Sequence, residues 1–133
     1  MAIQVLGAFT KVTTNGKVVG TSPVSAVNAA TGDSVASANI NDNLSGSKVQ
    51  VQLNVDTAYA DVAATLTVEA SLDGTNWVSV ATADADTDPN LTGYQVYNVD
   101  LTAVIAPYYR IHFNRLTAVN VGTSGKCQFA YCF

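Results

Sequence analysis

The sequence predicts an all-β protein, a two-sheet antiparallel β-sandwich of jelly-roll or immunoglobulin-like topology with eight or nine strands. Three observations support this class. Val, Ile and Thr, which favour strands, make up 38 of the 133 residues. Several segments alternate between apolar and polar residues, which is the period of a half-buried strand. Turn residues separate these segments at short intervals, as is typical of sandwiches. At this length we expect a single domain, residues 1–133.

The elements follow in chain order. Residues 1–9 are apolar and are interpreted as a first strand or a docking arm. Asn15-Gly16 then predicts a tight hairpin, because both residue types accept positive φ. Residues 82–93 are polar and non-periodic and predict a long loop, whereas 58–64 has the composition of a single helical turn. The remaining strands are predicted at 49–55, 64–72, 77–81, 94–100, 108–114 and 126–133.

The two cysteines, Cys127 and Cys132, lie five residues apart in one predicted strand. An odd spacing places their side chains on opposite faces of the sheet. At strand rise their Cα atoms would be about 16 Å apart, too far for a disulfide. We therefore expect two free thiols.

Charged residues are scarce, at 12% of the chain, and the net charge is -4. The six basic residues are scattered, whereas nucleic-acid and anionic-membrane binders cluster Lys and Arg. We therefore expect no nucleic-acid partner and no membrane partner. No apolar run approaches the ~20 residues of a spanning helix. The short apolar N-terminus has no basic region or cleavage pattern of a signal peptide, which predicts synthesis in the cytoplasm.

A resemblance rests on two segments. Residues 69–77 read Glu-Ala-Ser-Leu-Asp-Gly-Thr-Asn-Trp, and residues 108–113 read Tyr-Tyr-Arg-Ile-His-Phe. A Ser-x-Asp-Gly-x-x-Trp hairpin followed by a Tyr-Arg-Ile strand resembles the discoidin-like (galactose-binding-like) sandwiches. It also resembles the small β-sandwich virion proteins of tailed bacteriophages, of the capsid decoration or cement type. Discoidin-like modules usually belong to secreted multidomain chains with a disulfide clamp, so the features above favour the virion group.

The virion resemblance implies a non-enzymatic structural protein that binds and stabilises the shell of the major capsid protein. It implies a homo-oligomer, with a trimer favoured, located in a virion whose parts are made in the host cytoplasm. A neck, tail or baseplate role stays open. The apolar ends of the chain are the candidate capsid contacts: Ile3, Val5, Leu6, Phe9 and Phe133.

Catalytic motifs are missing from the sequence. It has no nucleophile elbow, phosphate loop or His-Glu-x-x-His pattern, and His112 is the single histidine. We therefore expect no enzyme activity and no cofactor.

The alternative function is carbohydrate binding, by a head fibre or a tail appendage. The candidate glycan contacts are Trp77, Tyr94, Tyr97 and Arg110. The structural alternative makes Trp77 a ring that caps the core between the sheets, and makes Arg110 a salt bridge between strands or subunits.

Asp84, Asp86 and Asp88 have the alternating carboxylates of a calcium loop. Pro89 stands in place of the turn glycine of an EF-hand, and Gln95 in place of its bidentate glutamate, so an EF-hand is excluded. The remaining alternatives are a looser calcium site and a solvated acidic loop.

Overall fold

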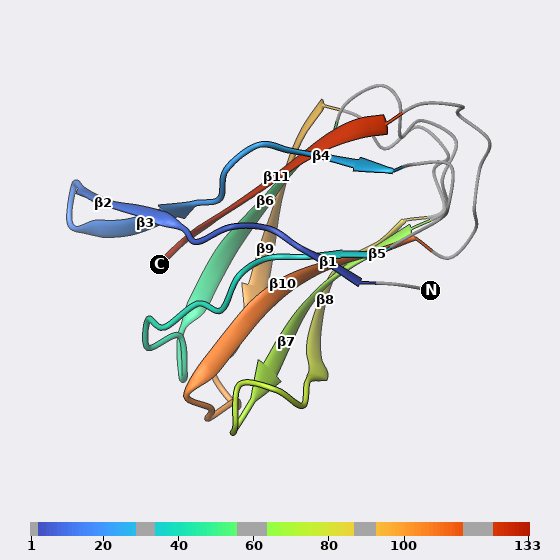
Figure 1. The fold of residues 1–133 in the computed structure, drawn as a ribbon. Coiled ribbons are helices and arrows are strands. Elements are labelled where there is room, and N and C mark those ends of the chain that lie inside the picture. Colours follow the sequence, from blue (N-terminus) through green and yellow to red (C-terminus); the bar gives the residue numbers. More distant parts are fainter. Residues whose placement is uncertain (1–2, 29–33, 56–63, 87–92, 116–123) are drawn as a thin grey trace.

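The structure, a computed structural model, describes residues 3–28, 34–55, 64–86, 93–115 and 124–133. These residues form two packed β-sheets, one of five strands and one of six (Figure 1). The predicted two-sheet β-sandwich is therefore confirmed. The strands outnumber the eight or nine expected because short segments of three or four residues also pair, and such segments show no clear alternation in the sequence. No helix among the described residues has the length and hydropathy of a membrane span.

The five-stranded sheet has the order β1-β5-β10-β7-β8. Its strands, in chain order, are β1 (Ile3–Val5), β5 (Ser34–Ala36), β7 (Ala64–Ser71), β8 (Val78–Asp86) and β10 (Tyr108–Arg115). Neighbouring strands are antiparallel except for β1 and β5, which run parallel. The N-terminal strand therefore joins this sheet beside β5, while the next strand along the chain belongs to the other sheet.

The six-stranded sheet has the order β2-β3-β11-β6-β9, with β4 paired to β11. Its strands are β2 (Thr10–Thr14), β3 (Lys17–Thr21), β4 (Ser25–Asn28), β6 (Lys48–Val55), β9 (Gly93–Asp100) and β11 (Ser124–Cys132). The long β11 pairs with β4 along its first half and with β3 along its second half. All these pairs are antiparallel.

The hairpin of β2 and β3 turns at Asn15-Gly16, as predicted. Asn15 has φ 52° and Gly16 has φ 73°, the left-handed values that such a two-residue turn requires. Every residue of β2 is exposed, and the hairpin projects from the body of the sandwich (Figure 1). Its outer half is therefore held by strand pairing rather than by a core.

The core lies between the two sheets and follows the alternation in the sequence. In β10 the inward residues Tyr109, Ile111 and Phe113 are buried, while Arg110 and His112 face away from the core. The other buried apolar residues of the cluster are Leu6, Val35, Ile40, Leu44, Val49, Val51, Leu53, Leu66, Val68, Ala70, Val99, Leu101, Cys127, Phe129 and Tyr131.

Residues 3–9 are part of the sandwich. After β1, the backbone N–H of Leu6 donates to the carbonyl of Ala36 at 2.9 Å, and the Leu6 side chain is buried in the core. Of the two interpretations of residues 1–9, the structure supports the first strand, because Leu6 would lose its core contacts in a free arm.

The predicted loop over 82–93 is wrong in its first part. Strand β8 continues to Asp86, paired with β7. Two register shifts, between Leu66 and Thr67 and between Val68 and Glu69, break the regular alternation of this pair. Irregular pairing of this kind hides a strand from a sequence pattern. The predicted helical turn over 58–64 lies outside the described residues, except that Ala64 begins β7.

Candidate functional site

A buried ion cluster lies on the outer face of the five-stranded sheet. Glu69 of β7 stands directly opposite Arg110 of β10, and its side chain is almost buried, with 8% of the residue exposed. Arg110 Nε donates to Glu69 Oε2 at 2.5 Å, and His112 Nδ1 lies 2.7 Å from Glu69 Oε1. The guanidinium carbon of Arg110 lies 4.5 Å from the centre of the Trp77 ring, a cation–π contact.

Both carboxylate oxygens of Glu69 are therefore engaged. Burial alone would raise the pKa of Glu69, but the hydrogen bonds and positive charge of His112 and Arg110 outweigh it and hold the pKa below the ordinary value. Because an ionised carboxylate only accepts, His112 Nδ1 is the donor in this contact. Its buried Nε2 has no hydrogen-bond partner among the described residues. This arrangement ties β7 to β10 and gives each carboxylate oxygen of Glu69 a partner within the sheet.

The sequence did not identify Glu69 as the centre of this cluster. One feature of the sequence could have pointed to it: Glu69 is the only glutamate, and it occupies an outward position of an alternating strand. Its partner on β10 depends on the register between strands about 40 residues apart in the chain, which no local pattern gives. Of the two interpretations of Arg110, the structure bears out the salt bridge between strands.

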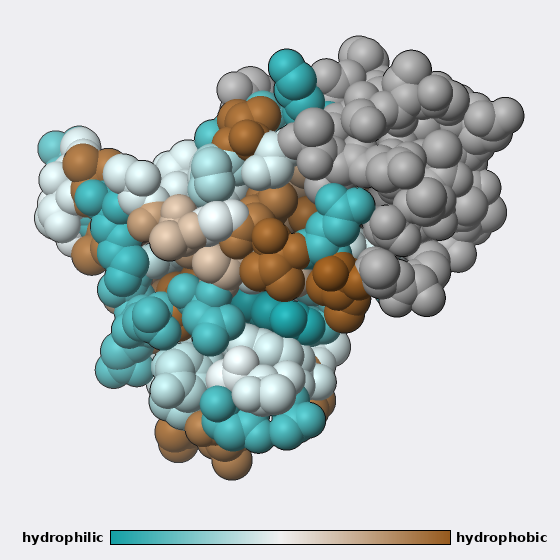
Figure 2. Space-filling view, in the orientation of Figure 1, coloured by the Kyte–Doolittle hydropathy of each residue, from teal (hydrophilic) through white to brown (hydrophobic). Residues whose placement is uncertain are grey.

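An apolar hollow of about 480 Å³ opens at the end of the sandwich where β7 turns into β8. Three of its side chains stand far out in solvent: Leu72 is 79% exposed, Val78 66% and Ile105 89%. Figure 2 shows hydrophobic surface at this lower end of the molecule. We call it the end hollow; its aliphatic lining is Ala70, Leu72, Val78, Val80, Val104, Ile105 and Ala106.

The turn of the Ser-x-Asp-Gly-x-x-Trp motif fixes this end hollow. Asp73 Oδ1 accepts the backbone N–H of Asn76 at 2.7 Å and the Ser71 hydroxyl at 2.9 Å. Gly74 has φ 77°, and its N–H donates to the Ser71 hydroxyl oxygen at 2.9 Å. The hydrogen bonds from Asn76 are the main reason that the pKa of Asp73 is lowered. The Asp73 carboxylate therefore stays ionised and keeps accepting the bonds that close the turn. Leu72 sits in this turn, beyond the end of β7, and therefore points into solvent rather than into the core.

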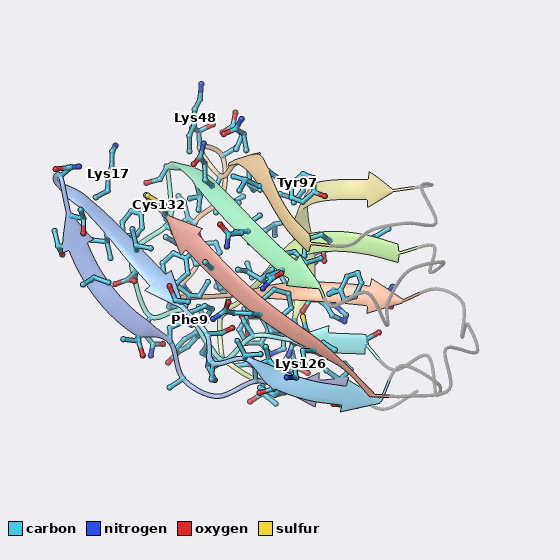
Figure 3. All side chains as sticks on the ribbon, turned by 90° about the horizontal axis from the view of Figure 1, so that it is seen from above. Phe9, Lys17, Lys48, Tyr97, Lys126 and Cys132 are labelled. Carbon is cyan, nitrogen blue, oxygen red and sulfur yellow. The ribbon has the colours of Figure 1, made fainter. Side chains whose placement is uncertain are left out.

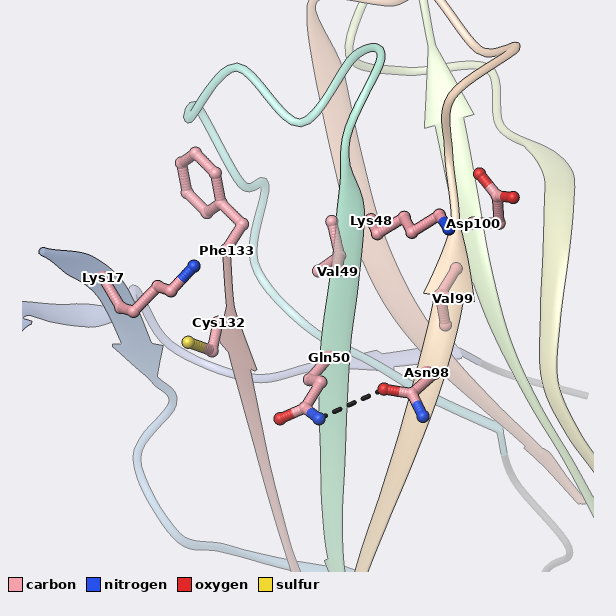
Figure 4. Close-up of a pocket in the computed structure, with 9 residues that line it drawn as sticks. All are labelled: Lys17, Lys48, Val49, Gln50, Asn98, Val99, Asp100, Cys132 and Phe133. Atoms are coloured by element: carbon pink, nitrogen blue, oxygen red, sulfur yellow. Dashed lines mark hydrogen bonds between the residues drawn. The ribbon is translucent and has the colours of Figure 1, made fainter.

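A second hollow of about 630 Å³, the sheet hollow, lies at one end of the six-stranded sheet (Figure 4). Here β3 and β6 begin and β9 and β11 end. Gln50 and Asn98 are exposed on adjacent strands, and Gln50 Nε2 donates to Asn98 Oδ1 at 3.1 Å. The full lining is Lys17, Lys48, Val49, Gln50, Asn98, Val99, Asp100, Cys132 and Phe133.

The predicted capsid contacts divide into exposed and packed residues. Ile3 and Val5 are at least half exposed on the edge strand β1. Phe9 and Phe133 instead pack against the core, and both rings contact Tyr131, at centroid distances of 5.0 and 6.4 Å. With Leu6 buried as well, Ile3 and Val5 remain the two apolar side chains of this set most available to a partner.

The predicted glycan contacts do not gather at one described site. Trp77 is not part of the buried core, so it does not cap it; its ring lies against Arg110 in the ion cluster. Tyr97 belongs to the other sheet and packs against the core. Tyr94 lies in β9, but its side chain is outside the described residues.

The structure does not describe the side chains of the predicted calcium ligands. Asp84 and Asp86 are in the last residues of β8, where only the backbone is described, and Asp88 follows beyond it. Among the described residues, no group of three or more His, Cys, Asp or Glu side chains is placed to hold a metal ion. The two cysteines are free, as expected: Cys127 is buried and Cys132 is half-buried.

No protein-family model and no curated protein matches the chain. Among solved structures, it is similar to PliG of Aeromonas hydrophila, a periplasmic inhibitor of g-type lysozyme. The identity is 12%, with 97% of this chain and 95% of that chain covered and a TM-score of 0.43. It is also similar to chitosan-binding module 1 of a chitosanase/glucanase from Paenibacillus sp. IK-5. There the identity is 25%, the coverage 82% and 92%, and the TM-score 0.34. With both TM-scores below 0.5, neither likeness indicates a function for this chain.

Proposed function

We propose that this chain is a non-enzymatic virion protein that decorates the capsid of a tailed bacteriophage and cements the shell of the major capsid protein. The end hollow is the observation that supports this function best. Leu72, Val78 and Ile105 present apolar surface together at one end of the sandwich. Grouped exposed apolar side chains mark contact sites for other proteins.

The contact energy of one copy is modest. Burying a Leu, Val or Ile side chain contributes roughly 1.5–3 kcal/mol. Association costs at least about 4 kcal/mol of lost freedom, so three such anchors give a weak single contact. Copies joined in a homo-oligomer, with a trimer favoured, bind repeated sites together and gain through avidity. Because they bind the assembled shell and not its separated subunits, they stabilise the shell by mass action.

The low charge of the protein fits the same function. Charged residues make up only 12% of the chain. Stripping water from an exposed charge is costly, whereas Thr, Ser, Asn and Gln lose less on desolvation. A sandwich with few charges therefore packs against a neighbour at low desolvation cost.

The copy number per virion tests this proposal. We expect virions of the phage that encodes this chain to contain it in numbers on the order of hundreds, as a shell of repeated subunits requires. The measurement is quantitative mass spectrometry of purified virions against the major capsid protein. A copy number of about ten would place the protein in the neck, tail or baseplate instead, and its absence would refute a virion role.

A pair of variants tests the end hollow itself. Leu72→Ser with Ile105→Ser should reduce binding to capsids stripped of this protein by at least about tenfold, because two apolar anchors are lost. The control is Val96→Ser, which alters a valine on the other sheet that is also more than half exposed, at 55%. Co-sedimentation measures occupancy, and circular dichroism confirms that all variants fold. Equal binding by the double variant and the control would exclude the end hollow as the contact.

A further inference from the structure

We propose that two copies of this chain pair through the free edge of β2, so that their two six-stranded sheets join into one continuous sheet. Strand β2 is the last strand of its sheet: β3 lies on one side of it, and no described strand lies on the other. The β2–β3 hairpin stands at the outer end of the sheet, beside the labelled Lys17, in Figure 3. This surface is separate from the end hollow, and pairing there needs no capsid.

The free edge of β2 lacks the features that keep exposed edges from pairing. Such edges are normally blunted by a proline, a bulge, a very short strand or a charged side chain. Strand β2 has five residues, no proline and an unshifted register with β3. Its one charged residue, Lys11, is tied to Asp42 of the same chain, with Nζ 3.1 Å from Oδ1, so it leaves no uncompensated charge on the edge.

The other described edges are better protected. Strands β1 and β4 have only three and four residues. Strand β8 pairs with β7 through two register shifts, and β9 lies against β8. Strand β2 is therefore the described edge most open to another strand.

The hydrogen-bonding groups on this edge follow from those of β3. Val18 N–H donates to the Phe133 carbonyl at 3.1 Å, and Phe133 N–H donates to the Val18 carbonyl at 3.2 Å. The backbone of Val18 therefore faces β11, and in an antiparallel ladder its partner Thr13 faces away from β3. The same alternation turns the backbone of Lys11 to the free edge. The edge thus presents two N–H donors and two carbonyl acceptors, those of Lys11 and Thr13.

These four groups are complementary to themselves. A two-fold axis at Val12 places Lys11 opposite the second copy's Thr13, and Thr13 opposite its Lys11, so that four backbone hydrogen bonds form. Val12 then faces its own counterpart as a non-hydrogen-bonded pair, with Cα atoms about 4.5 Å apart. Val12 is 57% exposed and shares a face with Val19, its neighbour on β3, so the seam joins two apolar pairs into one row.

The seam is small and joins copies in twos. A strand of five residues spans about 17 Å, which places a contact one strand wide at the low end of interface sizes. We therefore expect pairing that depends on concentration. The two-fold axis closes the contact at two copies, and a trimer would need a different contact.

Sedimentation equilibrium up to about 1 mM protein tests the pairing, and amide exchange at the same concentrations locates it. We expect a reversible dimer. The exchange rates of the Lys11 and Thr13 amides should fall in proportion to the monomer fraction, because these N–H groups bond only across the seam. The Val12 amide already bonds β3, so its rate should change little.

Charge variants at Val12 test the position of the two-fold axis. Val12→Lys and Val12→Glu each place like charges opposite one another, so each alone should associate at least about tenfold more weakly than the wild type. Mixed in equal amounts, they place opposite charges there and should form a heterodimer. The matched control is Val96→Lys, at a valine 55% exposed on β9 of the same sheet, which should dimerise as the wild type does. Circular dichroism confirms that all variants fold.

Four results would overturn the inference: a wild type that stays monomeric at about 1 mM, undiminished association of Val12→Lys, no heterodimer in the mixture, or a dimer in which the exchange of Lys11 and Thr13 is unchanged. The last result would place the contact on another surface. Failure of this test leaves the capsid contact at the end hollow intact, and the reverse also holds.

Discussion

Tyr131 leaves room for nothing larger than hydrogen at position 20. A Cβ added to Gly20 would lie 2.2 Å from the Tyr131 ring. The ring is buried, and its hydroxyl donates to the Asp42 carboxylate, so it cannot swing aside. Burial and Asp42 also raise the pKa of Tyr131, which keeps the hydroxyl protonated as a donor. Single side chains of this kind determine which backbone positions may approach one another.

Gly20→Ala is therefore expected to destabilise the protein by about 1–3 kcal/mol through overpacking. Urea unfolding followed by tyrosine fluorescence measures the change. The control is Gly7→Ala, where the added Cβ would meet the edge of the Pro23 ring at 3.2 Å and need only a small shift. An equal loss in both variants would contradict the assignment of the effect to Tyr131.

Glu69→Gln tests the ion cluster through its pH dependence. The pKa of Glu69 is lower in the folded protein than its ordinary 4.5. Such a carboxyl group stabilises the fold fully above 4.5, and the contribution is lost as the pH falls through the folded value. The variant should be destabilised by about 3 kcal/mol at pH 7, because Arg110 and His112 lose their buried partner.

The difference between wild type and Glu69→Gln should shrink as the pH falls below 4.5. Urea denaturation at a series of pH values measures this difference directly. A difference that stays constant down to pH 3 would mean that Glu69 does not titrate as the cluster requires.

Among the elements, the β2–β3 hairpin depends most on its turn. No residue of β2 is buried, so strand pairing and the Asn15-Gly16 turn hold its outer half. Strand β8 instead depends on its long pairing with β7, in which the register shifts twice. The local sequence therefore predicted the hairpin and missed the end of β8.

Gly16→Ala should open the hairpin while the sandwich stays folded. An alanine at φ 73° costs about 1–2 kcal/mol in the left-handed region. We expect amide exchange in β2 to accelerate about tenfold or more, with little change in β6 and β7. Asn15→Gly is the control, because glycine accepts the same φ. Uniform acceleration across all strands would show that the hairpin and the sandwich unfold together.

At the scale of the whole molecule, one cluster of buried side chains joins both sheets. Residues of β7 and β10 on one side meet residues of β6 and β11 on the other. Cys127 is a member of this cluster, and burial raises the pKa of its thiol to about 12. The thiolate is the reactive form, so Cys127 can react only when the two sheets separate.

The labelling rate of Cys127 should therefore report global unfolding. In a Cys132→Ser variant, a thiol reagent should label the native protein very slowly, and the rate should rise with urea in step with the unfolded fraction. In Cys127→Ser, the half-buried Cys132 should react without urea. Fast labelling of Cys127 in buffer alone would mean that the core opens locally.

Local sequence patterns were enough to predict the sandwich class, the Asn15-Gly16 turn, the inward positions of β6, β10 and β11 and the two free thiols. These features depend on residues within a few positions of one another, where the two-residue period of a strand and the φ preferences of a turn act directly. The sequence also singled out Trp77 and Arg110, although it left their role open.

Which of these features contact one another depends on how the strands pair across the whole fold. Glu69 lies opposite Arg110 because β7 pairs with β10 in one register, and Leu6 is buried because β1 lies beside β5. Both hollows form where strands distant in the chain end together. Register and sheet order are selected by packing of the whole core rather than by any local pattern, and a shift of one residue would turn every side chain of a strand to the other face.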